Sequence, residues 1–410
     1  MKTDRRYVSR SAISAVVLGA ALVLSSVSPG LAQAPEPAAN VPAAIGEGIP
    51  TNQIIIKYKD NAQISAANAP DALARLQTLS AVAGVELAYN RPMSGDAHVL
   101  RLPQRMPVRD VQEISSRLSA LTEVEYAEPD YIRQPLLTPN DPEYASQWHY
   151  FETYGLNLPT AWDIITGTAN VVVAVIDTGY RPHADMTGRF VQGYDFIGDV
   201  QVANDGNGRD NDAQDPGDWI TAAESASGYF AGCQVTNSSW HGTHVAGTIG
   251  ANSNNAAGVA GVNWGAKILP VRVLGKCGGY DSDIADGMRW AAGLAVTGVP
   301  TNANPAKVLN LSLGGSGSCP TTYQSAIHEI NAAGRIVVVA AGNSNANSSG
   351  FTPAGCAGVI TVGATDRSGL RAFYSNYGAV VDVSAPGGET SPTSSDGVLS
   401  TLNTGTQGPV

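Results

Sequence analysis

Basic residues are scarce in this sequence of 410 residues. Lysine and arginine together number 24, against 35 aspartates and glutamates, and the net charge is −11 at pH 7. Binding to nucleic acid depends on clustered basic side chains that neutralise phosphates, so this balance argues against a nucleic-acid partner. Charged residues amount to 14% and hydrophobic residues to 43%, which excludes a disordered chain and favours a compact one with a large core.

Long hydrophobic runs are absent except near the N-terminus. There, basic residues within positions 2–10 precede a mostly apolar run at 12–27, and small residues follow at Ala32 and Ala34. This pattern is typical of a secretory signal peptide, which we assign to residues 1–34 with cleavage after Ala32 or Ala34. A membrane anchor is the alternative, but the run is short and contains serines. We therefore expect a secreted, extracellular protein that has no contact with the membrane after signal cleavage.

Cysteines are few, and no two of the four stand at the C-x2-C spacing typical of zinc sites. Export to an oxidising compartment favours disulfides instead. Four cysteines allow three connectivities. Neighbouring loops of one domain supply the nearest partners, which favours the pairs Cys233–Cys277 and Cys319–Cys356.

Two folded domains follow a flexible spacer rich in alanine, proline and glycine at residues 35–51. Residues 52–136 form the first. Its apolar periodicity predicts a ferredoxin-like βαββαβ domain with strands at 54–58, 84–89, 98–102 and 124–131 and helices at 71–79 and 108–121.

The second domain, residues 137–410, has a different pattern. Near-continuous apolar runs at 171–176, 266–274, 308–313, 336–341 and 359–362 alternate with helical segments such as 282–294 and 322–333. Strands without polar alternation are buried on both faces, as in a parallel sheet between layers of helices. The predicted fold class is α/β, with a doubly wound parallel sheet.

Polar residues and glycines follow several of these strands. The first run ends in Asp177-Thr178-Gly179, the third in Ser312-Leu313-Gly314-Gly315 and the fourth in Ala341-Gly342-Asn343. His241 lies between the first two runs, at the start of a helix of small residues. Working groups of open parallel sheets gather beyond the carboxyl ends of the strands, so we expect these segments to share one rim.

These motifs resemble those of the subtilisin (S8) family of serine proteases, over roughly residues 145 to 410. Asp177 stands in an Asp-Thr-Gly motif, His241 in His-Gly-Thr-His-Val-Ala-Gly and Asn343 in Ala-Gly-Asn. The resemblance implies that Asp177 and His241 are catalytic and that Asn343 stabilises the oxyanion. It also implies that an extended polypeptide substrate pairs with Ser312, Leu313 and Gly314, which form one wall of the pocket. Ala341 and Gly342 form the facing wall, and Gly279 belongs to a second edge that flanks the substrate. These residues carry no charge, which suggests a broad, apolar-leaning preference for the residue before the cut.

The chemistry needs these residue types. A serine hydroxyl requires a base within hydrogen-bond reach, and the pKa of histidine suits that task. An aspartate at the other ring nitrogen fixes the tautomer and stabilises the imidazolium. Taken singly, Asp177 could be a turn former and Asn343 a loop residue. His241 and His244 could be a metal pair, although the glutamate that a zincin needs is replaced by Gly242.

The family's Gly-Thr-Ser-Met-Ala segment, which carries the nucleophile, has no counterpart here. Ser400-Thr401-Leu402 resembles the stretch that precedes it, and the given sequence then runs to Val410. We therefore expect this chain to be a C-terminally incomplete, inactive fragment of a serine endopeptidase, with the serine encoded shortly after Val410. The alternatives are a non-catalytic secreted binding or decoy protein and a metal-dependent hydrolase.

Two loops suggest structural Ca²⁺. The acidic, turn-rich segment 204–212 offers Asp210 and Asp212 as oxygen ligands, but its spacing does not fit an EF-hand, and a solvated loop is an equal alternative. Asp185, together with Asn254 in the 252–255 stretch, resembles the ligands of a calcium site of the family. The same resemblance implies that residues 52–136 are a propeptide that assists folding and inhibits its own protease domain until it is cut away, between residues 132 and 142.

Overall fold

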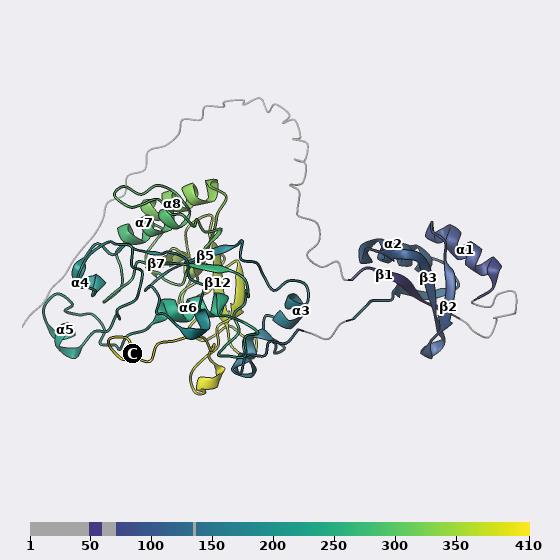
Figure 1. Ribbon diagram of the computed structural model, residues 1–410, viewed down its shortest axis with the longest axis horizontal. Coiled ribbons are helices and arrows are strands. Elements are labelled where there is room, and N and C mark those ends of the chain that lie inside the picture. Colours follow the sequence, from purple (N-terminus) through teal and green to yellow (C-terminus); the bar gives the residue numbers. More distant parts are fainter. Residues whose placement is uncertain (1–48, 60–70, 134–136) are drawn as a thin grey trace, which may run out of the picture. The chain divides into compact units, whose positions relative to one another are not determined.

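The computed structural model describes residues 49–59, 71–133 and 137–410 (Figure 1). The assigned signal peptide, most of the spacer and residues 134–136 of the link lie outside the described residues. No helix within the described ranges is long and apolar enough to cross a membrane.

The N-terminal unit, residues 49–133, is a small α+β domain. Its elements are β1 (Thr51–Tyr58), α1 (Leu73–Ala83), β2 (Ala88–Pro92), the 3₁₀ helix η2 (Ser94–Asp96), β3 (Ala97–Met106), α2 (Val108–Ser119) and β4 (Val124–Pro129). The four strands form an antiparallel sheet in the order β2-β3-β1-β4, which confirms the predicted ferredoxin-like arrangement.

Hydrophobic periodicity explains this fold. Ile54, Ile56 and Tyr58 alternate along β1 and are buried, and α2 buries Val111 and Leu118 on the face that packs against the sheet. The first helix is longer than predicted. It ends only at Gly84, whose φ of 71° is left-handed and terminates the helix, so the next strand begins at Ala88 rather than at residue 84.

The C-terminal unit, residues 137–410, is built on a seven-stranded parallel sheet with the order β13-β12-β10-β8-β5-β7-β6. The strands are β5 (Val172–Asp177), β6 (Tyr194–Asp195), β7 (Lys267–Arg272), β8 (Val308–Leu311), β10 (Ile336–Ala340), β12 (Ile360–Thr365) and β13 (Val383–Pro386). A two-stranded ribbon pairs β9 (Gly315–Ser316) with β11 (Phe351–Thr352). All five predicted strands and the α/β fold class are confirmed.

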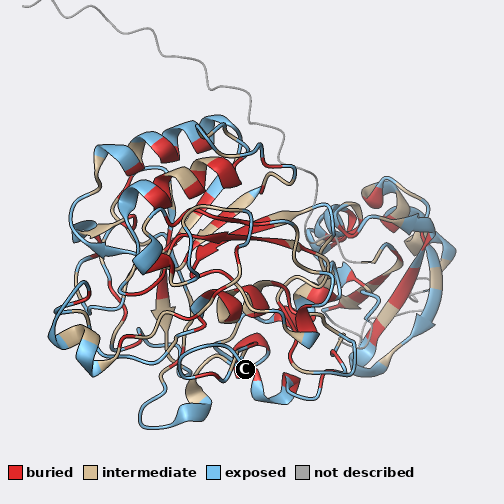
Figure 2. Cartoon of the chain, turned by 60° about the vertical axis from the view of Figure 1, so that its left-hand side comes forward, coloured by how far each residue is buried: buried red, intermediate tan, exposed pale blue. Residues whose placement is uncertain are grey.

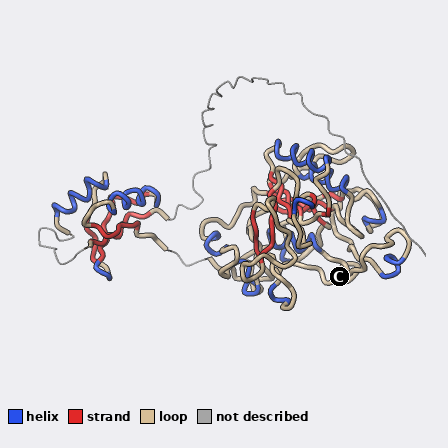
Figure 3. Tube along the Cα trace, turned by 180° about the vertical axis from the view of Figure 1, so that it is seen from behind, coloured by secondary structure: helices blue, strands red, loops and turns tan. Residues whose placement is uncertain are grey.

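Helices lie on both faces of this sheet. The longer ones are α6 (His241–Gly250), α7 (Asp281–Ala291) and α8 (Thr321–Ala332), which occupy the positions that the sequence predicts. The shorter ones are α3 (Leu158–Trp162), α4 (Val200–Ala203) and α5 (Ala222–Ala226), with 3₁₀ turns η3 (Tyr144–Ser146), η4 (Trp148–Tyr150), η5 (Ala184–Met186), η6 (Ser348–Gly350) and η7 (Ser394–Asp396). Figure 3 shows these helices around the strands.

The two faces of the sheet have different cores. Helices α7 and α8 pack on one face, where Ile176 and Leu309 are fully buried, and α6 packs on the other over Val175 and Ile268. Burial is thus densest around β5, β7 and β8 (Figure 2). Since neighbouring residues of β5 point to opposite faces, this strand has to be apolar throughout, as its sequence is.

One part of the sheet is less covered. Along β10 and β12, on the face that carries α6, the side chains of Ile336 and Ile360 are 48% and 40% exposed. Val338 pairs in register with Ile360, so the partly exposed residues of the two strands lie side by side. An apolar parallel sheet normally has both faces covered, and this area departs from that rule.

Candidate active site

Asp177 is the last residue of β5, and its side chain is fully buried. The backbone N–H of Thr178 donates to Oδ1 at 2.7 Å, which fixes the carboxylate at the rim of the sheet. A carboxylate at this depth needs partners for its charge. The second partner comes from α6.

His241 is the first residue of α6 and faces Asp177. Its Nδ1 lies 2.8 Å from Oδ1 and 2.9 Å from Oδ2 of that carboxylate. The helix approaches β5 closely because position 242 is glycine: a Cβ there would lie 2.1 Å from the carbonyl oxygen of Gly179. This explains why the His-Gly-Thr sequence brings the imidazole to the end of the strand.

The charges around the ring favour its protonated form. Burial lowers the pKa of His241, but the hydrogen bond and charge of Asp177, together with the charges of Asp218 and Asp215, outweigh it and hold the pKa above the ordinary 6.5. Since a carboxylate only accepts hydrogen bonds, Nδ1 carries a proton, and in the neutral ring Nε2 is the basic nitrogen. The pair can therefore act as a general base oriented by a buried carboxylate.

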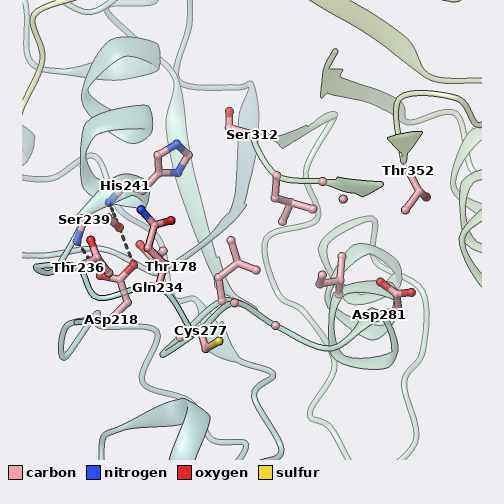
Figure 4. Close-up of a pocket in the computed structure, with 18 of the residues that line it drawn as sticks. Thr178, Asp218, Gln234, Thr236, Ser239, His241, Cys277, Asp281, Ser312 and Thr352 are labelled. Atoms are coloured by element: carbon pink, nitrogen blue, oxygen red, sulfur yellow. Dashed lines mark hydrogen bonds between the residues drawn. The ribbon is translucent and has the colours of Figure 1, made fainter. Parts of the chain in front are cut away.

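A cavity of about 680 Å³ opens beside His241. The predicted wall of Ser312, Leu313 and Gly314 lines it, and so does Gly279 of the predicted second edge. Figure 4 shows Ser239, Asp218 and His241 at one end and Asp281 and Thr352 at the other. Asp218 and Asp281 were not selected from the sequence. We expected the walls of the cleft to be uncharged, but these two residues place two carboxylates in it.

Ala341, Gly342 and Asn343 follow β10 at the same edge of the sheet, but they are not among the residues that line this cavity. The side chain of Asn343 is exposed. The turn is held by buried Asn376, which donates to the carbonyl of Ala341 and accepts from the N–H of Ser344, both at 2.9 Å. Sequence reasoning missed Asn376, because it lies 33 residues after Asn343 and in no motif that we singled out.

Both disulfides form with the predicted connectivity, Cys233–Cys277 and Cys319–Cys356. Cys277 itself lines the cleft next to Gly278 and Gly279. The other bridge lies close in sequence to two wall segments, since Cys319 follows β9 and Cys356 follows β11. The two bridges therefore tie together segments that form the walls of the cleft.

The proposed pair of metal-binding histidines has other partners. Nδ1 of His241 donates to Asp177, and Nε2 of His244 donates to the carbonyl of Val398 at 3.1 Å. Over the described part of the chain, no cluster of three or more His, Cys, Asp or Glu side chains is arranged to hold a metal ion. The two histidines thus give a metal-dependent hydrolase no support.

Oxygen atoms gather at the suggested calcium site of Asp185 and Asn254. Asp185 accepts from Nδ2 of Asn255 at 2.9 Å and from the N–H of Val259 at 2.8 Å, and the N–H of Asn254 donates to Oδ2 of Asp141 at 2.6 Å. Asp141, which sequence reasoning missed, is 4% exposed, and its Oδ1 has no hydrogen-bond partner. Burial, offset in part by backbone hydrogen bonds and supported by the charge of Asp185, raises the pKa of Asp141. A cation would give Oδ1 of Asp141 a partner and offset the charges of the two carboxylates, so the residues fit Ca²⁺.

The acidic loop at 204–212 differs. Asp210 accepts from Nδ2 of Asn207 and from the N–H of Asp212, each at 2.7 Å, and Asp212 accepts from the N–H of Gln214 at 3.0 Å. Such local bonds shape a turn without an ion. A calcium role for Asp210 and Asp212 stays an untested prediction.

Comparison with known proteins supports this reading of the fold. Residues 168–410 match the subtilase family, and residues 36–130 match the N-terminal prodomain of fervidolysin. The chain is 46% identical over 385 residues to an extracellular protease of Xanthomonas campestris, covering 90% of the chain and 64% of that protein. It is 42% identical to an extracellular basic protease of Dichelobacter nodosus, covering 87% of the chain and 58% of that protein.

Among solved structures, a protease of Pseudoalteromonas arctica is similar with 56% sequence identity and a TM-score of 0.64, over 67% of this chain and 80% of that one. The chain spans about three-fifths of the length of the two relatives from Xanthomonas and Dichelobacter. The subtilase match covers more than half of the 410 residues and includes Asp177, His241 and the residues that line the cleft beside them. The chain therefore belongs to the subtilase family.

Proposed function

We propose that this chain is the larger part of a secreted serine endopeptidase precursor, which cuts polypeptides by a Ser-His-Asp mechanism. The observation that carries the proposal is the pairing of His241 with buried Asp177, 2.8 Å apart, at one end of a cleft of about 680 Å³. The relatives named extracellular proteases support both the activity and the location.

In this mechanism the free Nε2 of His241 takes the proton of a serine hydroxyl as the hydroxyl attacks the peptide carbonyl. Asp177 keeps the proton on Nδ1 and stabilises the imidazolium that forms. The protonated Nε2 then delivers the proton to the leaving amine. Because the base has to be neutral and the pKa of His241 is raised above 6.5, hydrolysis should increase as the pH rises through that raised pKa.

The cleft suits an extended chain. Ser312, Leu313 and Gly314 and the facing edge at Gly278 and Gly279 line it, and glycines let a substrate backbone approach closely. Asn343 is proposed to donate its side-chain N–H to the oxyanion once the catalytic serine and substrate bring the carbonyl to this rim. Ala341 and Gly342 are proposed to form the wall opposite Ser312.

We place the serine in sequence that follows Val410. Within the described residues, no hydroxyl makes a hydrogen bond with Nε2 of His241, whose ring is bonded only through Nδ1. The partly exposed apolar area around Ile336 and Ile360 supports the same proposal, because a further apolar segment would cover it. Without the serine, the 410-residue chain is proposed to be inactive.

The N-terminal unit is proposed to be a propeptide that assists folding and blocks the cleft of its own protease domain. Its match to the fervidolysin prodomain supports this role. Residues 132–142 are the proposed cleavage region. The N–H of Leu137 donates to Asp163 at 2.7 Å, which anchors the beginning of the C-terminal unit.

A serine-directed phosphonylating reagent tests the function. The product of the complete gene should bind one equivalent and lose peptidase activity, and N-terminal sequencing should find a mature end near Leu137. The 410-residue chain should bind none and keep its propeptide. Stoichiometric labelling of the 410-residue chain would refute the placement of the serine, and a stop codon directly after Val410 would favour a non-catalytic binding protein.

We further propose that Asp141, Asp185 and Asn254 hold a structural Ca²⁺ ion. The ion would neutralise two carboxylates that are buried close together and would link the segment around Asp141 to the 252–259 loop. Its contribution would be to stability, since none of these residues lines the cleft.

Adding Ca²⁺ at about 100 times its Kd to chelator-treated protein should raise the free energy of unfolding by about 2.7 kcal/mol. For a unit of this size the melting temperature should rise by about 5–10 °C. The variant Asp141→Asn should lose this increase, whereas Glu143→Gln, an exposed acid two residues away, should keep it. Calorimetry with and without Ca²⁺ measures both. An equal increase in the two variants, or none in the parent, would contradict the proposal.

A further inference from the structure

Asp218 holds the segment that leads into α6. Its Oδ1 accepts from the backbone N–H of Ser239 at 2.6 Å, and its Oδ2 accepts from the Ser239 hydroxyl at 2.7 Å. The hydroxyl oxygen of Ser239 in turn accepts from the backbone N–H of His241 at 3.3 Å. Figure 4 shows this chain of contacts at the wall of the cleft. One carboxylate is thus connected, through a single serine, to the backbone of the proposed base.

The segment needs such support because Trp240, between Ser239 and His241, has a left-handed backbone with a φ of 50°. This conformation is unfavourable for a bulky side chain and persists only when surrounding contacts hold it. The indole of Trp240 is buried and donates to the carbonyl of Gly405, which fixes the residue from the other side. The Asp218–Ser239 contacts and the Trp240 anchor together set the direction in which α6 starts, and with it the place of the imidazole.

The charge of Asp218 also acts on the ring. The ionisable groups that influence His241 are Asp177 on β5, Asp215 and Asp218 on the loop before α5, and His244 on α6 itself. Asp177 contributes most, and Asp218 ranks before Asp215 among the carboxylates that raise the pKa of His241. Burial raises the pKa of Asp215 to about 6, so its negative charge is lost more readily than that of an ordinary aspartate.

We propose that Asp218 is a positioning residue for the proposed catalytic base: it fixes Ser239 and the backbone of His241, and its charge stabilises the imidazolium. The proposal rests on the proposed peptidase function for its consequence in catalysis. The hydrogen bonds from Asp218 through Ser239 to His241, and the interaction of the Asp218 charge with the ring, belong to this chain whether or not a serine completes the site. Asp218 acts through Ser239 and does not itself contact His241 in any hydrogen bond that the described residues make.

The interaction can be measured by NMR titration of the 410-residue chain with ¹³C-labelled histidine. The six histidines give six signals, and His241→Gln identifies one of them. In Asp218→Asn the pKa of His241 should fall, because a negative charge that favours the imidazolium is removed. Asp163→Asn is the matched control and should leave the pKa of His241 unchanged. Like Asp218, Asp163 accepts a hydrogen bond from a backbone N–H, but it is not among the groups that act on His241. Equal titration midpoints in parent and Asp218→Asn would overturn the electrostatic role.

A second variant tests the link if Asp218→Asn does not fold. Ser239→Ala keeps the charge and the N–H bond to Asp218 but removes the hydroxyl that accepts from His241. Hydrogen exchange at the His241 amide should become about tenfold faster, as expected when one such bond is lost. An unchanged exchange rate would overturn the positioning role.

Activity separates this proposal from the function on which it rests. In the product of the complete gene, Asp218→Asn should shift the acid limb of kcat/KM to lower pH and reduce kcat at the plateau by about tenfold, with KM within twofold, as a displaced base does. If the complete product shows no peptidase activity, the proposed function fails, while the titration and exchange results still decide the role of Asp218.

Discussion

Replacing His241 by alanine in the product of the complete gene is expected to lower kcat about 10⁶-fold. In subtilisin itself, loss of the catalytic histidine alone has an effect of this size, because the serine, histidine and aspartate act as a unit. The same reason applies here if Nε2 of His241 is the only base that can reach the serine hydroxyl. KM should change little, since the ring contributes to proton transfer and not to holding the peptide backbone.

The measurement is steady-state hydrolysis of a peptide amide at a pH where the parent is fully active. His328→Ala is the matched control, because His328 is an exposed histidine on α8 that does not line the cleft, and its loss should leave kcat unchanged. Melting temperatures of both variants show whether they fold. A folded His241→Ala variant that retains more than about one thousandth of the parent kcat would refute the role of this histidine.

The second large effect is expected from Asp177→Asn, which should lower kcat about 10⁴-fold. The substitution preserves the shape of a fully buried side chain, so the fold should persist. Its amide, however, can donate to Nδ1 of His241, where the carboxylate could only accept. The proton of the neutral ring then moves to Nε2, and the nitrogen that faces the serine can no longer act as a base.

Nitrogen-15 spectra of His241 detect this change of tautomer, and they can be recorded on the 410-residue chain as well as on the longer product. The parent should show a protonated Nδ1 and Asp177→Asn a protonated Nε2. The rate loss and the tautomer change should occur together. A 10⁴-fold loss without the change of tautomer would mean that Asp177 acts by charge alone, and retention of activity would remove it from the mechanism.

Much of this architecture could be predicted from the sequence because its signals are local. A buried parallel strand is apolar throughout, so runs such as 171–176 stand out, and motifs such as His-Gly-Thr-His stay contiguous. Two strands of the seven-stranded sheet were not predicted: β6 has only two residues, and β13 is short and largely exposed at the edge of the sheet. Neither buries enough apolar side chains to leave a periodic pattern.

The residues that sequence reasoning missed act over long distances along the chain. Asp218 contacts Ser239 from 21 residues away, Asn376 holds the turn at Ser344 from 32 residues away, and Asp141 contacts Asn254 from 113 residues away. Each is a single polar residue in a loop rich in turn formers, where aspartate and asparagine are expected anyway. Only the folded chain shows that their partners belong to the site.

The two disulfides have a consequence for the proposed peptidase when it is surrounded by copies of itself. One bridge joins Cys233 to Cys277, 44 residues later, and closes a loop of chain that contains the whole of α6. The other joins Cys319 to Cys356 and closes a loop that contains α8 and β10. A single cut anywhere inside either loop leaves both ends of the chain covalently joined. The molecule can thus be nicked once in these stretches without releasing a piece, so damage by a neighbouring molecule does not by itself dismantle the walls of the cleft.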